Sequence, residues 1–191
     1  MKWAIDPNHS VAQFTIRHMM AKVRGTISIK DGWLEGEDHA TAKVDVTLDP
    51  ATINTGVAIR DNHLRSADGF FDVANYPTIT FTSKKIVGTD PAGFKVVGDL
   101  TMHGVTKEVT LDAAFGGEGK DPWGNRRVSF SAETRVNRKD FGLTWNQALE
   151  TGGWLVGDEV RVDLEVEAIP AQKPAEATEK LEAAARAESA A

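Results

Sequence analysis

The sequence predicts an all-β protein: an eight-stranded antiparallel β-barrel with an apolar interior, a short helix between strands and a C-terminal helical or disordered tail. Three observations predict this fold. Eight segments alternate apolar and polar residues, as strands with one buried face do. Turn residues separate several of these segments. No helical segment of the body is long enough to cover a sheet, so the apolar faces must cover one another in a sandwich or a closed barrel. Closure also removes exposed sheet edges, which favours the barrel.

The first three strands precede the segment that breaks the alternation. Apolar residues take every second position from Phe14, from Val23 and from Ala42. These strands are expected over 13–20, 23–30 and 42–49. The pair Asp31-Gly32 is typical of a turn, so we expect the second strand to end before it.

Residues 57–70 lose the period of two and predict a short helix between strands. Ile59 and Leu64 are the residues expected to face inward. Asp68-Gly69 is expected to end the helix, because glycine commonly follows the last helical turn.

Five further strands follow the helix. They are expected over 78–82, 94–102, 109–115, 127–136 and 160–168. The turns expected among them are Asp90-Pro91-Ala92-Gly93, His103-Gly104, Gly116-Gly117-Glu118-Gly119 and Asp121-Pro122-Trp123-Gly124. A barrel of eight strands leaves room inside for side chains or for one small ligand.

The composition changes at Ile169-Pro170, which divides the chain into a barrel domain, 1–169, and a C-terminal tail, 170–191. Nine of the last 21 residues are alanine. Thr178 can cap a short helix there, although a helix of this length is marginal unless it docks. The tail is expected to be solvated, or else to pack on a partner chain.

The composition of the whole chain excludes several classes of function. The 191 residues carry a net charge of −6. A negative balance argues against nucleic-acid binding and against a polybasic membrane anchor. The chain has no cysteine, which excludes disulfides, thiolate zinc sites, iron–sulfur clusters and a cysteine nucleophile.

The start of the sequence bears on location. No apolar run precedes Asp6, and nothing approaches about 18 consecutive apolar residues, the length of a membrane-spanning helix. As the sequence stands we expect a cytoplasmic protein without stable membrane insertion. A periplasmic protein whose leader had been removed would look the same.

Four blocks of sequence within residues 6–169 form a recognisable set. The first two blocks are His9-Ser10 with Phe14, Arg17-His18 and Val23-Arg24-Gly25, and then Thr55, 60–66, Phe70-Phe71-Asp72, Tyr76-Pro77 and Ile79-Thr80-Phe81. The last two are Gly98-Asp99-Leu100-Thr101 with 104–107 and Val109, and then 137–142 with 156–160 and Glu167-Ala168. Together these four blocks resemble the YceI-like family of polyisoprenoid-binding proteins.

The resemblance implies a lipocalin-like antiparallel barrel, often dimeric, whose lumen holds one long apolar chain such as a polyisoprenoid or a quinone tail. It implies no reaction and no cofactor. A lumen of this kind requires apolar side chains facing inward, since an isoprenoid is held by removing its surface from water. The residues expected to bind the ligand are Phe14, Ile16, Ile27, Ile29, Val46, Phe81, Phe94, Val96, Leu100, Met102, Leu111, Phe130, Val162 and Leu164. Met19 and Met20 are expected to add adaptable lining. The alternative is that these side chains simply fill a solid barrel.

Polar residues of the expected helix could lie at the mouth of the barrel. Arg60, Asp61, His63 and Arg65 are candidates for contacts to a ligand head group such as a pyrophosphate. The alternative is that they are hydrogen-bonded fixtures. Arg138 and Asp140 are expected to form an ion pair that fixes a turn.

No catalytic or metal site is expected. The histidines come from separate segments, and no tight pair of the H-E-x-x-H kind is present. No G-x-S-x-G elbow and no phosphate-binding glycine loop occur. The expected function is therefore non-catalytic binding, storage or transport of a polyisoprenoid or similar lipid. Two alternatives stay open: a solid-barrel structural or stress protein, and an accessory enzyme acting on an isoprenoid or quinone through Asp61 and His63.

Overall fold

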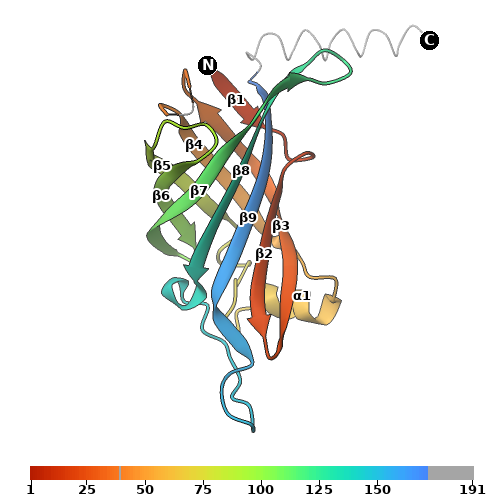
Figure 1. The fold of residues 1–191 in the computed structure, drawn as a ribbon. Coiled ribbons are helices and arrows are strands. Elements are labelled where there is room, and N and C mark those ends of the chain that lie inside the picture. Colours follow the sequence, from red (N-terminus) through yellow and green to blue (C-terminus); the bar gives the residue numbers. More distant parts are fainter. Residues whose placement is uncertain (39, 172–191) are drawn as a thin grey trace, which may run out of the picture.

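The computed structural model describes residues 1–38 and 40–171. The tail expected over 170–191 therefore lies almost entirely outside the described residues. The strands are β1 Lys2–Ile5, β2 Val11–His18, β3 Ala21–Glu35, β4 Lys43–Asn54, β5 Ile79–Val87, β6 Phe94–Met102, β7 Val105–Lys120, β8 Arg126–Asn137 and β9 Val156–Pro170. The helices are α1 Ala58–Arg65 and the short 3₁₀ helix η1 Arg138–Phe141 (Figure 1).

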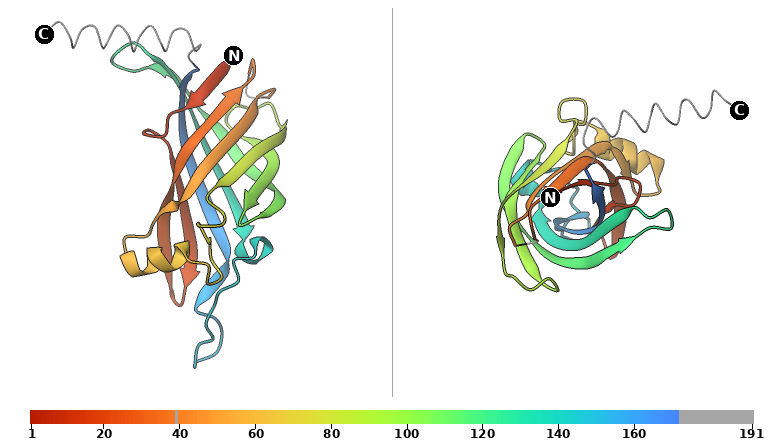
Figure 2. Two further views of the ribbon diagram at one scale, coloured as in Figure 1. Left: turned by 180° about the vertical axis from the view of Figure 1, so that it is seen from behind. Right: turned by 90° about the horizontal axis from the view of Figure 1, so that it is seen from above.

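The nine strands of the described chain fill eight positions around a closed antiparallel barrel. Each strand from β2 to β9 pairs with its neighbours in sequence, and β2 pairs with β9 to close the ring (Figure 2, right). The short β1 continues the position of β2, because both lie between β3 and β9: Ala4 pairs with Trp33 and Ile169, and Phe14 pairs with Gly25 and Val162. The predicted eight-stranded antiparallel barrel is confirmed, and β1 is an addition to it.

Two of the expected turns are wrong, because the chain stays in a strand at both places. β3 runs through Asp31-Gly32 with a register shift after Ile29. A Cβ on Gly32 would lie 2.8 Å from the carbonyl oxygen of Asp45, so glycine is needed there for close strand packing. β7 likewise runs through 116–119, with a bulge between Phe115 and Gly117.

The helix is shorter than expected. It ends at Arg65 because Ser66 adopts an extended backbone conformation, and the Ser66 hydroxyl donates to the carbonyl oxygen of His63. Leu64 is half-buried against the core as expected. Ile59, also expected to face inward, is not part of the core: its side chain is 81% exposed and lies at the edge of the lumen.

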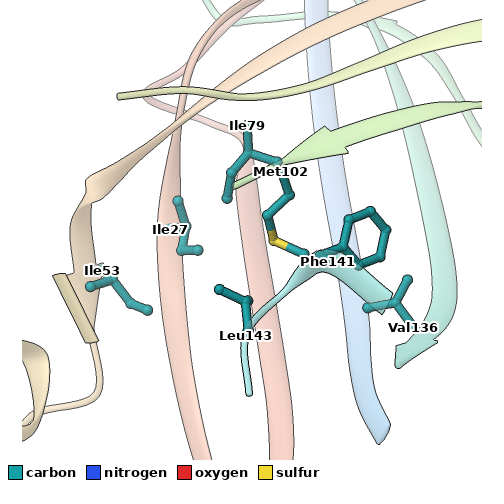
Figure 3. Packing of buried hydrophobic residues seen from close by; sticks show 7 residues of the cluster. All are labelled: Ile27, Ile53, Ile79, Met102, Val136, Phe141 and Leu143. Atoms are coloured by element: carbon teal, nitrogen blue, oxygen red, sulfur yellow. The ribbon is translucent and has the colours of Figure 1, made fainter. Parts of the chain in front are cut away.

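The barrel has two distinct ends. The N-terminal end comprises Met1 and the turns that join β3 to β4 and β7 to β8, and the helical end comprises α1, the β2–β3 turn and the loop 142–155 (Figures 1 and 2). At the helical end, buried side chains of several strands meet Phe141 of η1 and Leu143 (Figure 3). This cluster consists of Ile27, Ile53, Ile79, Met102, Val136, Phe141 and Leu143.

An ionic network fixes the N-terminal end. The Arg127 guanidinium lies 2.8 Å from the carboxylate of Asp6, 3.1 Å from that of Glu167 and 3.3 Å from that of Asp121. These ion pairs connect β8 to β9, to the β7–β8 turn and, through Asp6, to the segment between β1 and β2. Burial raises the pKa of Asp6, but hydrogen bonds from Arg127, from His9 and from a backbone amide outweigh burial, so the pKa of Asp6 lies below its ordinary value.

Candidate ligand-binding site

The lumen is an elongated cavity of about 960 Å³ that runs between the two ends of the barrel. Its lining includes Met1 and Trp3 at the N-terminal end and Ile59 and Trp145 at the helical end. Every one of the nine strands contributes side chains to it. In the described part of the chain, the lumen is therefore not filled by side chains.

All fourteen residues expected to bind a ligand lie along this cavity: Phe14, Ile16, Ile27, Ile29, Val46, Phe81, Phe94, Val96, Leu100, Met102, Leu111, Phe130, Val162 and Leu164. They face inward because side chains of a strand alternate between the two faces of a sheet. Their contact with a ligand stays a prediction.

The lining residues fall into two groups by exposure. Some are buried among their neighbours, as Phe81 and Val96 are. Others, such as Ile16, Leu111 and Val162, are only half-buried although they face the lumen. Their remaining surface lies in the cavity, where an apolar ligand could cover it.

The two ends of the cavity differ in charge. The lining at the helical end includes Arg60 and Arg138 together with His18 and His63. The lining at the N-terminal end includes the carboxylates of Glu35, Glu37 and Glu118 beside Arg126. Because opposite charges attract more strongly where little water intervenes, an anionic head group would be favoured at the helical end.

The four polar residues expected at the mouth separate into two pairs. Arg60 and His63 line the cavity, whereas Asp61 and Arg65 do not. The Asp61 carboxylate is buried and accepts hydrogen bonds from the amide and the hydroxyl of Thr55. Arg65 donates to the carbonyl oxygens of Ala51 and Ile53, both at 2.7 Å, and so holds α1 against the end of β4. Asp61 and Arg65 are the hydrogen-bonded fixtures of the alternative interpretation.

Aromatic rings partly cover the helical end. The His63 ring meets Trp145 edge-on at 4.8 Å between ring centroids, and it meets Phe70 at 5.1 Å. Phe70 and Trp145 are 5.5 Å apart. Trp145 is therefore packed against its neighbours, whereas Trp154 on the same loop is 62% exposed. These contacts join α1 to the loop 142–155 across the mouth.

Arg138 holds the loop 142–155 in place through hydrogen bonds. Its side chain is buried, and it donates to the carbonyl oxygens of Leu143, Trp145 and Gly157 at 2.6 to 2.8 Å. The ion pair expected with Asp140 is wrong: the carboxylate nearest to the Arg138 guanidinium is that of Asp158, at 3.5 Å. Burial lowers the pKa of Arg138, and the Asp158 carboxylate opposes that shift.

The sequence did not predict every residue that lines the cavity, and two residues that it did predict, Met19 and Met20, lie elsewhere. Trp3, Ile53 and Trp145 line the cavity, and Trp3 belongs to the strand that the alternation did not reveal. Met19 and Met20 form the exposed β2–β3 turn and lie outside the lumen. The alternation of apolar residues up to Met20 concealed this turn, since its first residue, Met19, takes a positive φ of 53°.

Residues 1–38 and 40–171 contain no group of three or more histidine, aspartate or glutamate side chains that could hold a metal ion. Within the same residues, no helix has both the length and the apolar character needed to cross a bilayer.

Comparisons with known proteins agree with this architecture. Residues 3–168 match the sequence model of the YceI-like domain. UPF0312 proteins of Staphylococcus aureus strains MSSA476 and N315 are each 39% identical over 169 residues, which cover 86% of this chain and 95% of the relative.

Solved structures of similar fold were also found. A YceI protein of Campylobacter jejuni superposes with a TM-score of 0.68 at 32% identity, covering 82% of this chain and 90% of its own. Burkholderia cenocepacia BcnA superposes at 0.71 with 20% identity, over 85% of this chain and 98% of BcnA. A polyisoprenoid binding domain from Saccharophagus degradans superposes at 0.60 with 16% identity, over 87% and 97% of the two chains. The last two share the fold at low identity.

Proposed function

The chain belongs to the YceI-like domain family, and on that premise we propose that it binds one long, largely apolar lipid, such as a polyisoprenoid or the tail of a quinone, non-covalently in the barrel lumen. The observation that carries the proposal is the continuous cavity of about 960 Å³ with apolar side chains along its length. Burial of apolar surface stabilises a complex by about 25 cal/mol per Å², which is the form of attraction that a hydrocarbon offers. The name of the Saccharophagus degradans domain, whose fold this chain shares, supports the ligand class.

The length of the lumen suits a long chain. β9 has 15 residues. At about 3.3 Å per residue and a tilt near 40°, a strand of this length spans about 38 Å along the barrel axis. A fully extended hydrocarbon chain advances about 1.2 Å along its axis for each main-chain bond, as an extended polypeptide does. A chain of about 32 main-chain bonds therefore fits within the length of about 38 Å spanned by the barrel. Each isoprene unit contributes four main-chain bonds, and the lumen therefore suits about eight units lying straight.

The contents of the cavity support binding rather than catalysis. The Asp61 carboxylate is turned to Thr55 and does not line the lumen. The His63 ring is packed between Phe70 and Trp145. General acid–base catalysis needs such groups within hydrogen-bond reach of one another or of the reacting atoms. These contacts support the proposal that the protein stores or transports the lipid rather than reacting with it.

Arg60 and His63 are proposed to meet the polar head of the ligand at the helical end. The Arg60 Nε atom donates to the Thr55 hydroxyl, and its Nη2 atom donates to the Thr55 carbonyl oxygen, so the guanidinium is held in place at the mouth. A guanidinium in a fixed position is well suited to bind an oxyanion.

The first experiment is mass spectrometry of the lipid extracted from protein purified without detergent, together with native mass spectrometry of the intact protein. A prenyl or quinone species at one molecule per chain is expected. Ala132 lines the lumen, and Glu133 next to it faces outward and is exposed. Ala132→Trp should therefore block uptake of added solanesol, whereas Glu133→Trp, which adds the same ring outside, should not. Protein that is empty and takes up no solanesol would contradict the proposal.

Two further expectations remain proposals. The family resemblance implies a homodimer, which sedimentation equilibrium would detect. The cytoplasmic location would be tested by fractionating cells of the source organism.

A further inference from the structure

Large apolar side chains are exposed around the mouth at the helical end. Met20 is 95% exposed, Ile59 81% and Trp154 62%. They belong to three separate elements, the β2–β3 turn, α1 and the loop 142–155, which lie at one end of the barrel in both side views (Figures 1 and 2). We call Met20, Ile59 and Trp154 the apolar rim. Single exposed apolar residues are ordinary, but three gathered at the opening of an apolar cavity indicate an interaction surface.

The apolar rim is continuous with the lumen. Ile59 is exposed and also lines the cavity. The backbone amide of Met19 donates to the carbonyl oxygen of Leu155 at 2.8 Å, so the β2–β3 turn and the loop 142–155 are joined. Leu155 lines the cavity as well. A lipid passing between the lumen and the outside at this end would therefore move along apolar side chains throughout.

A group of cations lies beside the apolar rim. Arg17 of β2 is directly opposite Lys22 of β3, and Arg24 lies one pair further along the same face. Within residues 1–38 and 40–171, none of the three has a carboxylate within ion-pair distance. Like charges in opposed positions destabilise a strand pair. In a chain with a net charge of −6, this local excess of positive charge is complementary to an anionic surface.

We propose that the helical end docks on the surface of an anionic lipid bilayer, with the apolar rim at the boundary between head groups and acyl chains and with Arg17, Lys22 and Arg24 against the lipid phosphates. Methionine, isoleucine and tryptophan suit that boundary, and tryptophan is enriched there. Such docking places the open mouth of the lumen against the membrane. It goes beyond binding in the lumen, because a barrel can dock whether or not its lumen is occupied.

A second copy of the chain is a poorer occupant of this surface. In a two-fold dimer the same patch meets itself, with residue i of one copy against residue j of the other. On the three elements of the apolar rim the exposed carboxylate is Glu150, whereas Arg17, Lys22 and Arg24 are three cations beside the rim, so two copies would bring an excess of positive charge into one interface. The charge therefore favours the bilayer.

Flotation with vesicles tests the proposal, with partition onto equimolar phosphatidylcholine and phosphatidylglycerol compared with phosphatidylcholine alone. Binding to the anionic vesicles should be stronger by at least tenfold and should weaken as salt is raised. The double variant Met20→Ser with Trp154→Ser changes two rim residues that do not line the cavity, and it should bind at least tenfold more weakly. Trp123→Ser is the matched control, since Trp123 is 82% exposed at the N-terminal end, and it should bind as the parent does.

A charge pair completes the design. Lys22→Glu should weaken binding by about fivefold or more, the effect of one basic residue near an anionic membrane. Lys120→Glu, at the opposite end of the barrel, should have little effect. Glu150 is an exposed carboxylate on the loop of Trp154, so Glu150→Gln should strengthen binding.

Three outcomes would overturn docking: no binding to anionic vesicles, equal losses in the Trp123→Ser control, or a dimer in solution that the Met20→Ser and Trp154→Ser changes dissociate. Solanesol delivered from ethanol to the same variants separates the two proposals. Variants that have lost docking should still take up solanesol, whereas failure of lipid binding would appear in the parent protein and in every variant alike.

Discussion

A single carboxylate placed in the lumen should convert lipid binding into a strongly pH-dependent process. Leu111 is the suitable position. It lines the cavity midway along β7 and is half-buried, so an aspartate there can be hydrated while the lumen is empty. When a lipid fills the lumen, the water leaves and the carboxylate is left among the apolar side chains that pack around Leu111, such as Val96 and Ala113. It must then take up a proton or remain as an unpaired charge, and protonation is the less costly choice.

The size of the effect follows from the cost of that protonation. An aspartate in water has a pKa of about 3.9, and each unit of pH above it costs about 1.4 kcal/mol. At pH 7 the Leu111→Asp variant should bind about 1,000-fold more weakly than the parent, or about 4 kcal/mol. At pH 5 the loss should be only about tenfold. Binding is linked to uptake of a proton, so the dissociation constant rises about tenfold for each pH unit above the ordinary aspartate value.

The assay is displacement of N-phenylnaphthylamine fluorescence by solanesol across this range of pH. Leu111→Asn removes the titration while keeping a polar side chain of the same size, so its loss of affinity should not depend on pH. Thr110→Asp places the same carboxylate on the exposed outer face one residue away and should leave affinity unchanged. A Leu111→Asp variant that binds solanesol as tightly as the parent at pH 7 would refute the reasoning, because a lipid would then not occupy the lumen beside Leu111.

Three further predictions concern the stability of the barrel, and urea unfolding checks each of them. Gly98→Ala should lower the free energy of unfolding by about 1–3 kcal/mol, because the new Cβ would overlap a carbonyl oxygen of the neighbouring strand. Gly119→Ala is the control and should change the free energy of unfolding little, because there is open space around Gly119. Equal losses of stability in the two variants would contradict this explanation. Asp6→Asn should cost about 1–3 kcal/mol at pH 7. The pKa of Asp6 is lowered in the folded state, so this difference should be complete above the ordinary aspartate pKa and vanish as the pH falls through the folded value. Arg138→Met should cost about 1–3 kcal/mol for each buried carbonyl oxygen left without a donor; a total below 1 kcal/mol would show that Arg138 does not hold the loop.

The wall of the barrel could be predicted from the sequence because its rule is local. A strand with one side toward an apolar lumen and one toward water must alternate, and each of the fourteen predicted lining residues lies along the cavity for that reason. The short helix was visible as the place where alternation fails. A closed eight-position ring then followed from the need to cover every apolar face.

Glycine was the main source of error in the strand boundaries. The same residue serves in a turn, where it permits a positive φ, and in a sheet, where it permits a close approach of backbones. Gly104 is of the first kind, with a φ of 73°. Gly32 is of the second kind, pressed between Ile5 and the backbone of β4. The partners that distinguish the two lie far away in sequence, so a local pattern cannot separate them.

The ends of the barrel were the least predictable part of the site. The loop 142–155 has no period, and its position depends on Arg138, which donates to carbonyl oxygens that carry no sequence signal. Trp145 reaches the mouth only because that loop crosses to His63. Arg60 and Arg65 stand five residues apart in one helical segment, yet only Arg60 lines the cavity, since Arg65 is held by the end of β4.

The division of the core explains how a hollow barrel can remain folded. One buried cluster lies at the helical end around Phe141, a second lies at the N-terminal end around Ile5 and Ala168, and a third joins β5, β6 and β7 around Phe81 and Phe94. The first two clusters join strands far apart in the chain, so closure of the barrel does not depend on filling the whole lumen. The half-buried side chains along the lumen are the part of the apolar surface that folding leaves uncovered. A lipid covering that surface binds the folded state and not the unfolded chain, so by mass action it must stabilise the barrel. Under the proposed function, occupancy of the lumen and resistance to unfolding are therefore coupled quantities.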